Sequence, residues 1–419
     1  MHRKTGLHLL LLVLIVLGIG ASAVGAQETI SIVHYYSDVL GKEAIGKILA
    51  NFNEAHPEYE VVDNSAGHED FKTQILVTIA GDNPPDIFSY WAGARTQFVT
   101  DAGRLMSLAD FWEENDLDSI IPAGVKAAAI YNDDIYLIPM NVHPTGFWYN
   151  PKVMADAGIT KMPETWDELK EACVTLKEAG VNPISLGSMN RWPAQFWFDY
   201  MVSYTAGAEY RQKLMAGEAK YTDPEVVTAM ETWKELTDLG CFAPDSNAYD
   251  WTEAADMVAN GTAAMNLMGT FITGYLNSIG LEPGVDYDFF PFPTINPDVP
   301  RVTHGTVDGW VVSADAKNPE GAKALLLHFV SKESQEIWAV GQGALAASTA
   351  VDTGIYSPVM AKAAEYLASV MFLSGYDLST TPPMAEGGLD MFAMFMNDPS
   401  GYMDYLDETQ AIADDVFGG

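Results

Sequence analysis

The sequence predicts an α/β protein of two lobes, each with a mainly parallel sheet flanked by helices. β-rich runs alternate along the chain with runs of helical hydrophobic spacing, which is typical of parallel sheets covered by helices. Hydrophobic residues make up 48% of the 419 residues and charged residues 19%, so the chain can bury a large core. The length exceeds that of one ordinary domain and no low-complexity linker divides it, which favours two lobes joined by more than one crossing of the chain.

The N-terminus has the features of a secretory signal peptide over residues 1–26. A basic start, Met1–Lys4, precedes an apolar run from Leu9 to Leu17, and small residues follow. This order predicts cleavage after Ala23 or Ala26 and a soluble protein in the periplasm or outside the cell. An uncleaved anchor is the disfavoured alternative, because the run is shorter than the roughly 20 apolar residues that span a bilayer.

The first part of the mature chain predicts strand, helix, strand, helix and strand in turn. Apolar residues alternate over 29–35, and those of 41–53 recur at helical spacing until His56-Pro57 ends the helix. Short β-rich runs at 60–62 and 86–90 enclose a second helix at 71–80. Such alternation predicts a parallel sheet with crossover helices.

The rest of the chain continues this alternation. Thr165 and Glu168 have the spacing of a capping box, so a helix begins there and ends near Gly180. Proline and glycine clusters near Pro139 and between Pro291 and Pro300 are the best candidates for lobe boundaries. We further expect strands at 183–186, 263–268 and 309–313, and helices at 224–239, from Asn318 toward Val340, and over 358–417 with breaks near Pro382 and Pro399.

The net charge argues against two classes of partner. Lys and Arg number 22 and Asp and Glu 57, which gives a formal charge of −35 at pH 7. The electrostatic field of a protein with this negative charge repels phosphate backbones and anionic lipid. We therefore expect no nucleic-acid partner and no electrostatic binding to membranes.

Motifs for cofactor chemistry are weak or missing in the sequence. Residues 341–346 match G-x-G-x-x-A, but they follow a predicted helix where the dinucleotide motif needs a strand. No P-loop, G-x-S-x-G or H-E-x-x-H occurs. The cluster His68-Glu69-Asp70 is better explained by a solvated loop than by a metal site, because one tripeptide cannot complete a coordination sphere. We therefore expect no cofactor and no metal.

Cys173 and Cys241 are the two cysteines of the sequence. An exported protein permits a disulfide between them. Two small buried thiols are an equally good interpretation. Both alternatives stay open at this point.

Aromatic residues follow several predicted strands, at the sheet edge where open α/β proteins bind ligands. Flat rings suit the apolar C–H faces of a sugar, and Asp, Asn, Arg, Glu and His side chains bind its hydroxyls. Core packing is the alternative for each ring taken alone. The rings are Tyr35, Tyr36, Tyr90, Trp91, Trp192, Phe271 and Trp310.

Four segments, in order along nearly the whole mature chain, carry a likeness to a known family. They are Ile30–Val61, Gly81–Phe88 with its G-x-x-P-P-D-I run, Ile138–Leu169 with P-x-N-x-H and W-Y-N-P, and Ala264–Gly269. In these segments the chain resembles the family 1 extracellular solute-binding proteins of bacterial ABC sugar transporters, of the maltose and glucose types. The third segment is the most specific of the four.

The resemblance implies a hinge-linked, two-lobed clamp of the periplasmic-binding-protein type (type II-like). A ligand would enter an open cleft, and its contacts with both lobes would favour the closed form. The implied N-lobe comprises residues 27–140 and 301–343, and the C-lobe residues 141–300 and 344–419. Hinge crossings are expected near 139–142, 293–303 and 343–348.

The resemblance also implies a function: a monomeric, non-catalytic substrate receptor of an ABC importer that delivers a mono- or short oligosaccharide to the membrane permease subunits. A secreted carbohydrate-active hydrolase, which needs two carboxylates across the scissile bond, stays open, as does the same clamp with a polyol or a peptide as cargo. The candidate ligand-binding residues are Tyr35, Tyr36, Ser37, Glu43, Tyr90, Trp91, Asn141, His143, Arg191, Trp192, Gly269, Thr270, Phe271, Asp308, Trp310 and Glu386.

Overall fold

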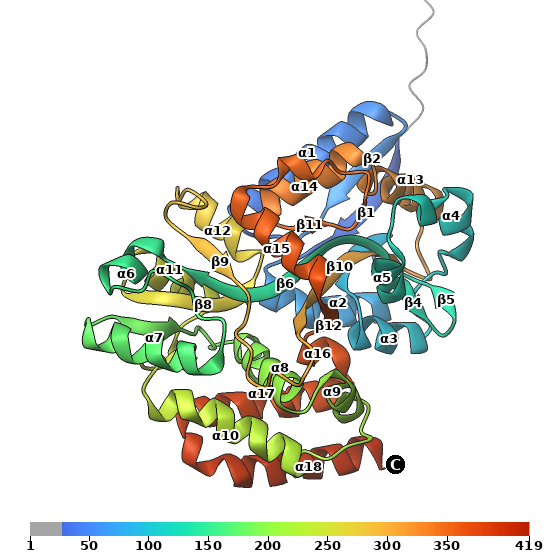
Figure 1. Cartoon of the computed structure of the whole chain (residues 1–419). Helices are drawn as coiled ribbons and strands as arrows, with labels where there is room; N and C mark the ends of the chain where they lie inside the picture. Colours follow the sequence, from blue (N-terminus) through green and yellow to red (C-terminus); the bar gives the residue numbers. More distant parts are fainter. Residues whose placement is uncertain (1–26, 419) are drawn as a thin grey trace, which may run out of the picture.

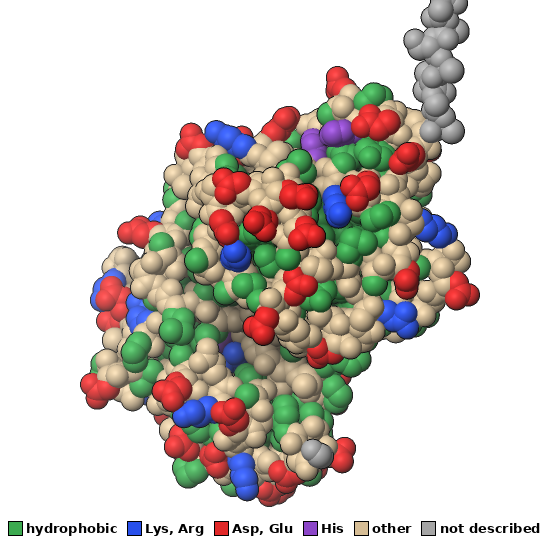
Figure 2. All heavy atoms as spheres, turned by 90° about the vertical axis from the view of Figure 1, so that its right-hand side faces the viewer, with side chains coloured by type: hydrophobic (Ala, Val, Ile, Leu, Met, Phe, Trp, Pro, Cys, Tyr) green, Lys and Arg blue, Asp and Glu red, His purple; other side chains and the backbone are tan. Residues whose placement is uncertain are grey.

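A computed structural model describes residues 27–418 of the chain, and the predicted signal peptide lies outside the described residues. The predicted α/β class is confirmed, because the strands form a mixed sheet surrounded by helices (Figure 1). Within the described part, no helix combines the length and the apolar character that crossing a membrane requires. On the face drawn in Figure 2, acidic side chains are spread over the whole surface with basic ones interspersed.

The main sheet has ten strands, in the order β2-β1-β3-β10-β6-β8-β7, with β9 and β11 paired to β6 and β12 paired to β10. Its strands are β1 (Glu28–Val33), β2 (Tyr59–Asp63), β3 (Ile87–Trp91), β6 (Ile138–Tyr149), β7 (Asn182–Ser185), β8 (Ala263–Gly269), β9 (Asp288–Phe290), β10 (Val302–Val312), β11 (Leu345–Ala346) and β12 (Met371–Ser374). The short strands β4 (Ile130–Tyr131) and β5 (Asp134–Ile135) pair with each other.

The helices expected at 41–53, 71–80, 165–180 and 224–239 are present, and the chain has several further helices that the sequence did not predict. In chain order, the helices are α1 (Val39–Ala55), α2 (His68–Ala80), α3 (Ala94–Asp101), α4 (Ala109–Glu114), α5 (Ala123–Lys126), α6 (Pro151–Asp156), α7 (Trp166–Glu178), α8 (Trp192–Thr205), α9 (Ala208–Met215), α10 (Pro224–Asp238), α11 (Trp251–Ala259), α12 (Ile272–Ser278), α13 (Pro319–Phe329), α14 (Lys332–Gln342), α15 (Pro358–Ser369), α16 (Tyr376–Ser379), α17 (Pro382–Asn397) and α18 (Tyr402–Phe417).

The sheet is parallel at its two ends and antiparallel in the middle. β1 pairs in parallel with β2 and β3, and β7 pairs in parallel with β8. In the middle, β10 runs antiparallel to β3 and β6, and β6 runs antiparallel to β8. The prediction of mainly parallel sheets therefore holds for the ends, whereas β6 and β10 are long strands that pass from one end of the sheet to the other (Figure 1).

Two hydrophobic cores lie at the two ends of the sheet. The first core includes Ile30, Ile87 and Trp310, and the second core includes Trp197 and Trp233. The crossing strands contribute to both, with Met140 of β6 and Val307 of β10 in the first core, and Trp148 of β6 and Val302 of β10 in the second. The crossing strands therefore connect the two cores.

Two predicted helices differ from the structure. The helix expected from Asn318 toward Val340 is two helices, α13 and α14, because the side chain of Ser331 accepts a hydrogen bond from the Ser334 backbone N–H and starts a new helix there. The helical prediction over 358–417 is wrong at β12, which pairs in parallel with β10. A strand of four residues carries too little periodicity to be found in the sequence.

Two local predictions have clear outcomes. The capping box is confirmed: Thr165 accepts from the Glu168 backbone N–H, and the Glu168 side chain accepts from the Thr165 backbone N–H. Cys173 and Cys241 are both fully buried, and their thiols are free. The structure therefore agrees with the interpretation of the two cysteines as buried free thiols.

Candidate functional site

A cavity of about 320 Å³ lies between the two cores, where the crossing strands pass. Tyr35 and Trp91 of the first core line one side of it, and Trp192 and Phe196 of the second core line the other. The volume falls at the lower end of the range of small-molecule sites, about 300–1,000 Å³. Half of the predicted ligand-binding residues line the cavity: Tyr35, Tyr36, Ser37, Trp91, His143, Trp192, Phe271 and Asp308.

The strand register explains which side chains reach the cavity. Trp91 of β3 is opposite Asp308 of β10, and Thr306 of β10 is opposite His143 of β6. Opposite residues of antiparallel strands share a face of the sheet, and residues two apart in a strand do as well. Trp91, Asp308, Thr306 and His143 therefore form the floor of the cavity. Tyr90 points to the other face of β3, where its ring meets that of Phe88 edge-on at 5.6 Å.

Three further predicted residues are buried behind the cavity lining. Asn141 is fully buried and donates from Nδ2 to Oδ2 of Asp308 at 2.8 Å. The hydroxyl of Thr270 lies 2.7 Å from Nδ1 of His143. Gly269 ends β8, and a Cβ atom there would meet the ring of Phe271 at 2.5 Å. These residues support side chains of the lining.

Tyr90 and four other predicted residues lie away from the cavity. Trp310 is fully buried and stacks on Phe329 with ring centroids 4.3 Å apart, so it belongs to the first core. Glu43 is on the exposed face of α1. Arg191 and Glu386 form an ion pair of 2.6 Å outside the cavity lining. For Trp310, core packing is therefore the correct one of the two alternatives, and contact with the ligand is not.

The solvated-loop interpretation of His68 is wrong. His68 begins α2, and its ring lies edge-on to Tyr35 at 5.4 Å and to Trp91 at 5.5 Å, on the cavity wall. Its Nδ1 lies 2.8 Å from Glu69 Oε1. Burial lowers the pKa of His68, so the ring is neutral at pH 7.

Sequence reasoning missed thirteen residues of the lining, and all of them except Thr306 of β10 lie on a helix or at its start. Several of them stand at helix starts: Asp38 is the N-cap of α1, Arg95 is in the first turn of α3, and Trp251 begins α11. Helices that follow parallel strands start at the edge of the sheet where ligands bind, and this signal could have identified them. The missed residues are Asp38, His68, Lys72, Arg95, Gln195, Phe196, Trp251, Thr252, Tyr275, Thr306, Gln342, Asp377 and Leu378.

Aromatic rings form two facing walls. On the first wall, Tyr35 and Trp91 stack with centroids 4.4 Å apart and planes 14° apart. On the second wall, Phe271 meets Trp192 at 6.0 Å and Trp251 at 5.4 Å, edge-on in both cases. Rings held in this way keep their position without a ligand, which suits a preformed site for an object with flat apolar faces.

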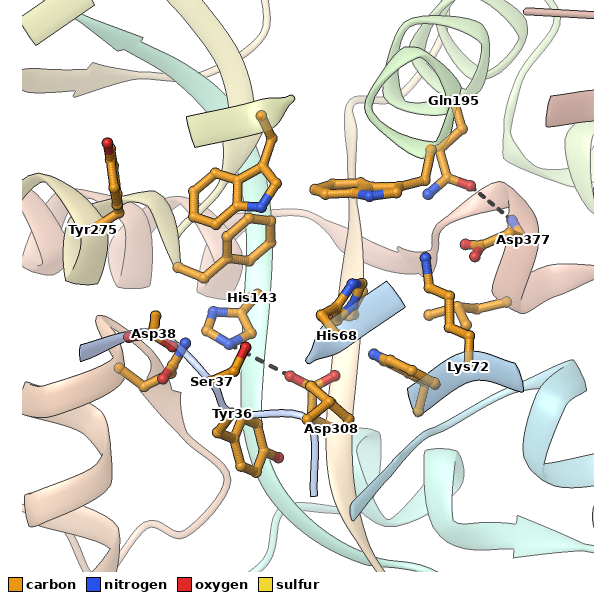
Figure 3. A pocket seen from close by; sticks show the side chains of 18 of the residues that line it. Tyr36, Ser37, Asp38, His68, Lys72, His143, Gln195, Tyr275, Asp308 and Asp377 are labelled. Atoms are coloured by element: carbon orange, nitrogen blue, oxygen red, sulfur yellow. Dashed lines mark hydrogen bonds and ion pairs between the residues drawn. The ribbon is translucent and has the colours of Figure 1, made fainter. Parts of the chain in front are cut away.

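Asp308 and His143 meet on the floor of the cavity. Asp308 is 5% exposed, and burial raises its pKa to about 6. Burial lowers the pKa of His143 to about 3, so this ring is neutral at pH 7. Its Nε2 lies 3.5 Å from Asp308 Oδ2 (Figure 3). The pair is therefore a carboxylate beside a neutral imidazole.

Six buried polar atoms of residues that line the cavity have no hydrogen-bond partner within the described chain, and one of them is Nε of Arg95. An unpaired buried polar group costs about 1–3 kcal/mol, so a ligand that pairs with such groups gains affinity. The other five atoms include donors and acceptors: the hydroxyl oxygens of Tyr35 and Tyr36, Nε1 of Trp192, Oδ1 of Asp308 and Oε1 of Gln342.

The cations on the cavity wall are already paired with acids. Lys72 lies 3.1 Å from Glu69, and Arg95 lies 3.2 Å from Asp377 and also over the ring of Trp91. Over residues 27–418, no group of three His, Cys, Asp or Glu side chains is arranged to hold a metal ion. The site can therefore offer aromatic faces and hydrogen bonds to a ligand of neutral charge.

Sequence comparisons show which known proteins the chain is similar to. A sequence profile described as bacterial extracellular solute-binding protein matches residues 38–336. An uncharacterised ABC transporter extracellular-binding protein of Pyrococcus horikoshii is 29% identical over 95% of this chain and 92% of its own length. The diacetylchitobiose binding protein DasA of Streptomyces coelicolor is 24% identical over 80% of this chain and 74% of its own.

Solved structures have the same fold. The bacterial solute receptor AcbH, described as exclusive for β-D-galactopyranose, superposes with a TM-score of 0.86 at 23% identity, over 93% of this chain and 99% of its own. A chitin oligosaccharide binding protein gives a TM-score of 0.86 at 23% identity, over 94% and 100%. The two-lobed clamp is thereby confirmed as the fold. Because the profile covers well over half of the sequence, the chain belongs to the family of bacterial extracellular solute-binding proteins.

Proposed function

We propose that the protein is the substrate-binding receptor of an ABC importer and that it captures a sugar in the cavity between the two cores. The observation that carries the proposal is the combination of two aromatic walls with unpaired buried donors and acceptors in one cavity. Sugars present apolar C–H faces and many hydroxyls, so they fit both features. The names of the relatives support a carbohydrate ligand, since one binds diacetylchitobiose and another is named for α-glucosides.

The proposal includes the working parts of a clamp. Residues 27–140 with 301–343 form the N-lobe, and residues 141–300 with 344–419 form the C-lobe, with β6 and β10 among the connections. The lobes close around the sugar, and the closed form is delivered to the permease subunits in the membrane. The protein works as a monomer in the periplasm or outside the cell, without catalysis, and its charge of −35 disfavours nucleic acid as a partner.

The expected affinity is moderate. Each aromatic stack adds about 0.5–1.5 kcal/mol beyond area burial, and each hydrogen bond about 0.5–1.5 kcal/mol net. Three rings and six bonds give roughly 4.5–13.5 kcal/mol before the costs of association and closure are subtracted, which leads to Kd values of about micromolar.

A ligand screen by thermal unfolding tests the proposal. The mature chain is heated with D-galactose, D-glucose, N,N′-diacetylchitobiose, raffinose, sorbitol or a tripeptide, each at millimolar concentration. A ligand at about 1,000 times its Kd stabilises the folded state by about 4 kcal/mol, so a sugar that binds raises the Tm by several degrees. Titration calorimetry then gives the Kd, and chromatography of the recovered sugar shows whether it is intact.

Each outcome of the screen has a meaning. A Tm raised by a sugar that is recovered unchanged supports the receptor. A Tm raised only by sorbitol or the peptide would overturn the sugar ligand while leaving the clamp. A recovered disaccharide that has been cleaved would overturn the non-catalytic role.

A further inference from the structure

The two carboxylate oxygens of Asp308 have different surroundings. Oδ2 accepts a hydrogen bond from Asn141 Nδ2 at 2.8 Å, whereas Oδ1 has no partner within residues 27–418. The side chain is 5% exposed and lines the cavity, and its carboxyl group points toward His143 and the centre of the site (Figure 3). A buried carboxylate in this position needs a second hydrogen-bond donor.

Asn141 is itself fixed from its other side. The indole of Trp338 in α14 donates from Nε1 to Asn141 Oδ1 at 2.7 Å. An indole N–H can only donate, so the amide oxygen of Asn141 must face Trp338 and its nitrogen must face Asp308. Asn141 and Trp338 are both buried, with 0% and 1% exposure. A chain of two hydrogen bonds thus joins α14, β6 and β10 to the floor of the cavity.

The backbone register makes this chain possible. Asn141 is the partner of Asp308, and Pro139 is the partner of Gly309, so Met140 is an extra residue that forms a bulge in β6. Bulges twist a strand and redirect its side chains, and they are common beside binding sites. Gly309 permits the close approach of the two strands, because a Cβ atom there would lie 2.5 Å from the Ile138 carbonyl oxygen.

We propose that Trp338 and Asn141 are positioning residues that keep the Asp308 carboxylate ionised with Oδ1 directed at the ligand, and that Asp308 selects ligands that donate a hydroxyl hydrogen bond to it. The selection rests on the sugar-binding function proposed above, whereas the positioning concerns the protein alone. Asn141, which the sequence suggested as a ligand contact, then acts through Asp308.

The groups around Asp308 determine how it titrates. His143 of β6 lies 3.5 Å away and is neutral at pH 7, and burial raises the pKa of Tyr35 and Tyr36, so these phenols stay protonated. The charged groups of the wider wall are Asp38, Lys72, Arg95 and Asp377. Burial raises the pKa of Asp308, and the bond from Asn141 is the largest of the opposing causes, ahead of the nearby hydroxyls of Tyr35 and Thr306. We therefore expect the pKa of Asp308 to rise further, toward neutral pH, when the bond from Asn141 is removed.

The positioning is tested on the ligand-free protein by carbon-13 NMR of chains labelled at the aspartate carboxyl carbon. The Asp308 signal is the one that disappears in Asp308→Asn. Asn141→Leu is expected to raise its titration midpoint by about one pH unit or more, and Trp338→Phe by a smaller amount. If Asn141→Leu does not fold, Trp338→Phe carries the test, because it keeps an aromatic ring of similar shape.

Matched controls come from the second core. Asn266 is a fully buried asparagine whose Nδ2 donates to the Ser185 carbonyl oxygen, and Trp233 is a fully buried tryptophan. Asn266→Leu and Trp233→Phe should lower the stability without moving the Asp308 midpoint. A midpoint that is unchanged in Trp338→Phe and Asn141→Leu, or that moves equally in the controls, overturns the positioning role.

The selection is tested by calorimetric titration with D-galactose and with N,N′-diacetylchitobiose between pH 5 and 9. Asp308→Asn is expected to weaken binding about 10- to 100-fold at pH 7 and above, and by less at pH 5, where the wild-type carboxyl group is itself largely protonated. Asn141→Leu is expected to bind weakly at pH 7 and to recover affinity at pH 9. Wild-type affinity in Asp308→Asn, or a pH profile for Asn141→Leu that matches the wild type, overturns the selection. A wild-type protein that binds neither probe overturns the sugar function, and the NMR titrations then decide the positioning role.

Discussion

Replacing Asp308 by asparagine is expected to stabilise the ligand-free protein at neutral pH. The carboxyl group is 5% exposed, and burial raises its pKa from the usual 3.8 to about 6. Asparagine has the same shape, and its amide oxygen can still accept the hydrogen bond from Asn141. The substitution therefore removes a buried charge while it keeps the packing and one hydrogen bond.

The magnitude follows from proton linkage. The pKa is higher in the folded state than in the unfolded state, so the folded protein binds this proton more tightly. As the pH rises from about 4 to about 6, the unfolded state has lost the proton and the folded state still holds it, so the stability falls through this window and stays lower above it. A shift of about 2 pH units at about 1.4 kcal/mol each gives a penalty of about 3 kcal/mol at pH 7.5.

Urea unfolding followed by circular dichroism measures this effect. The free energy of unfolding of Asp308→Asn should exceed that of the wild type by up to about 3 kcal/mol at pH 7.5. The two values should be equal near pH 4. Asp298→Asn, at an exposed position, is the control and should leave the stability within about 0.5 kcal/mol at both pH values. The reasoning is refuted if Asp308→Asn is no more stable at pH 7.5, or if its gain is the same at pH 4. A binding site that gains stability when it loses its ligand group is an example of the trade-off between stability and function.

Three further outcomes are expected. Trp192→Ala and Trp91→Ala should each weaken sugar binding about tenfold by calorimetry. Trp91→Ala should also have the lower urea midpoint, because Trp91 stacks on Tyr35 at 4.4 Å; equal midpoints would contradict this. The fully buried carboxylate of Asp199 lies 2.7 Å from the guanidinium of Arg211, and Arg211→Met removes this cation. The substitution should lower the free energy of unfolding in urea by about 3–5 kcal/mol. Breaking an exposed ion pair should lower it by less than about 1 kcal/mol. Glucuronate and galacturonate should bind at least tenfold more weakly than the neutral sugars in competition titrations, and equal affinity would disprove the neutral character of the site.

The ends of the sheet could be predicted from the sequence because local signals determine them. Alternation at 29–35 and helical spacing at 41–53 agree with β1 and α1, and the capping box at Thr165 starts α7. The middle depends on distant partners. Nothing near Met140 in the sequence indicates a bulge, because the bulge arises from the pairing of Asn141 and Pro139 with residues about 170 positions away.

The site was predictable to the extent that strand ends indicate it. Tyr35 and Trp91 stand at the ends of β1 and β3, and the rule that ligands bind at this edge places them on the wall. The same rule was too coarse for Tyr90 and Trp310, because strand alternation and core packing turn these rings away. His68 was missed because its contacts with the rings of the wall exist only after the chain has folded.

The place of the cavity on the crossing strands links ligand binding to closure. The unpaired groups belong to both sides, with Tyr35 and Asp308 from the first core side and Trp192 from the second. In the proposed clamp, a sugar bound to the open form touches one wall, so contacts with the other wall are made in the closed form alone. One added stack and one added hydrogen bond give about 2 kcal/mol, which corresponds to about a 30-fold shift toward the closed form. Closure therefore depends on a ligand wide enough to reach both aromatic walls, and a sugar ring with a flat face and edge hydroxyls meets that condition.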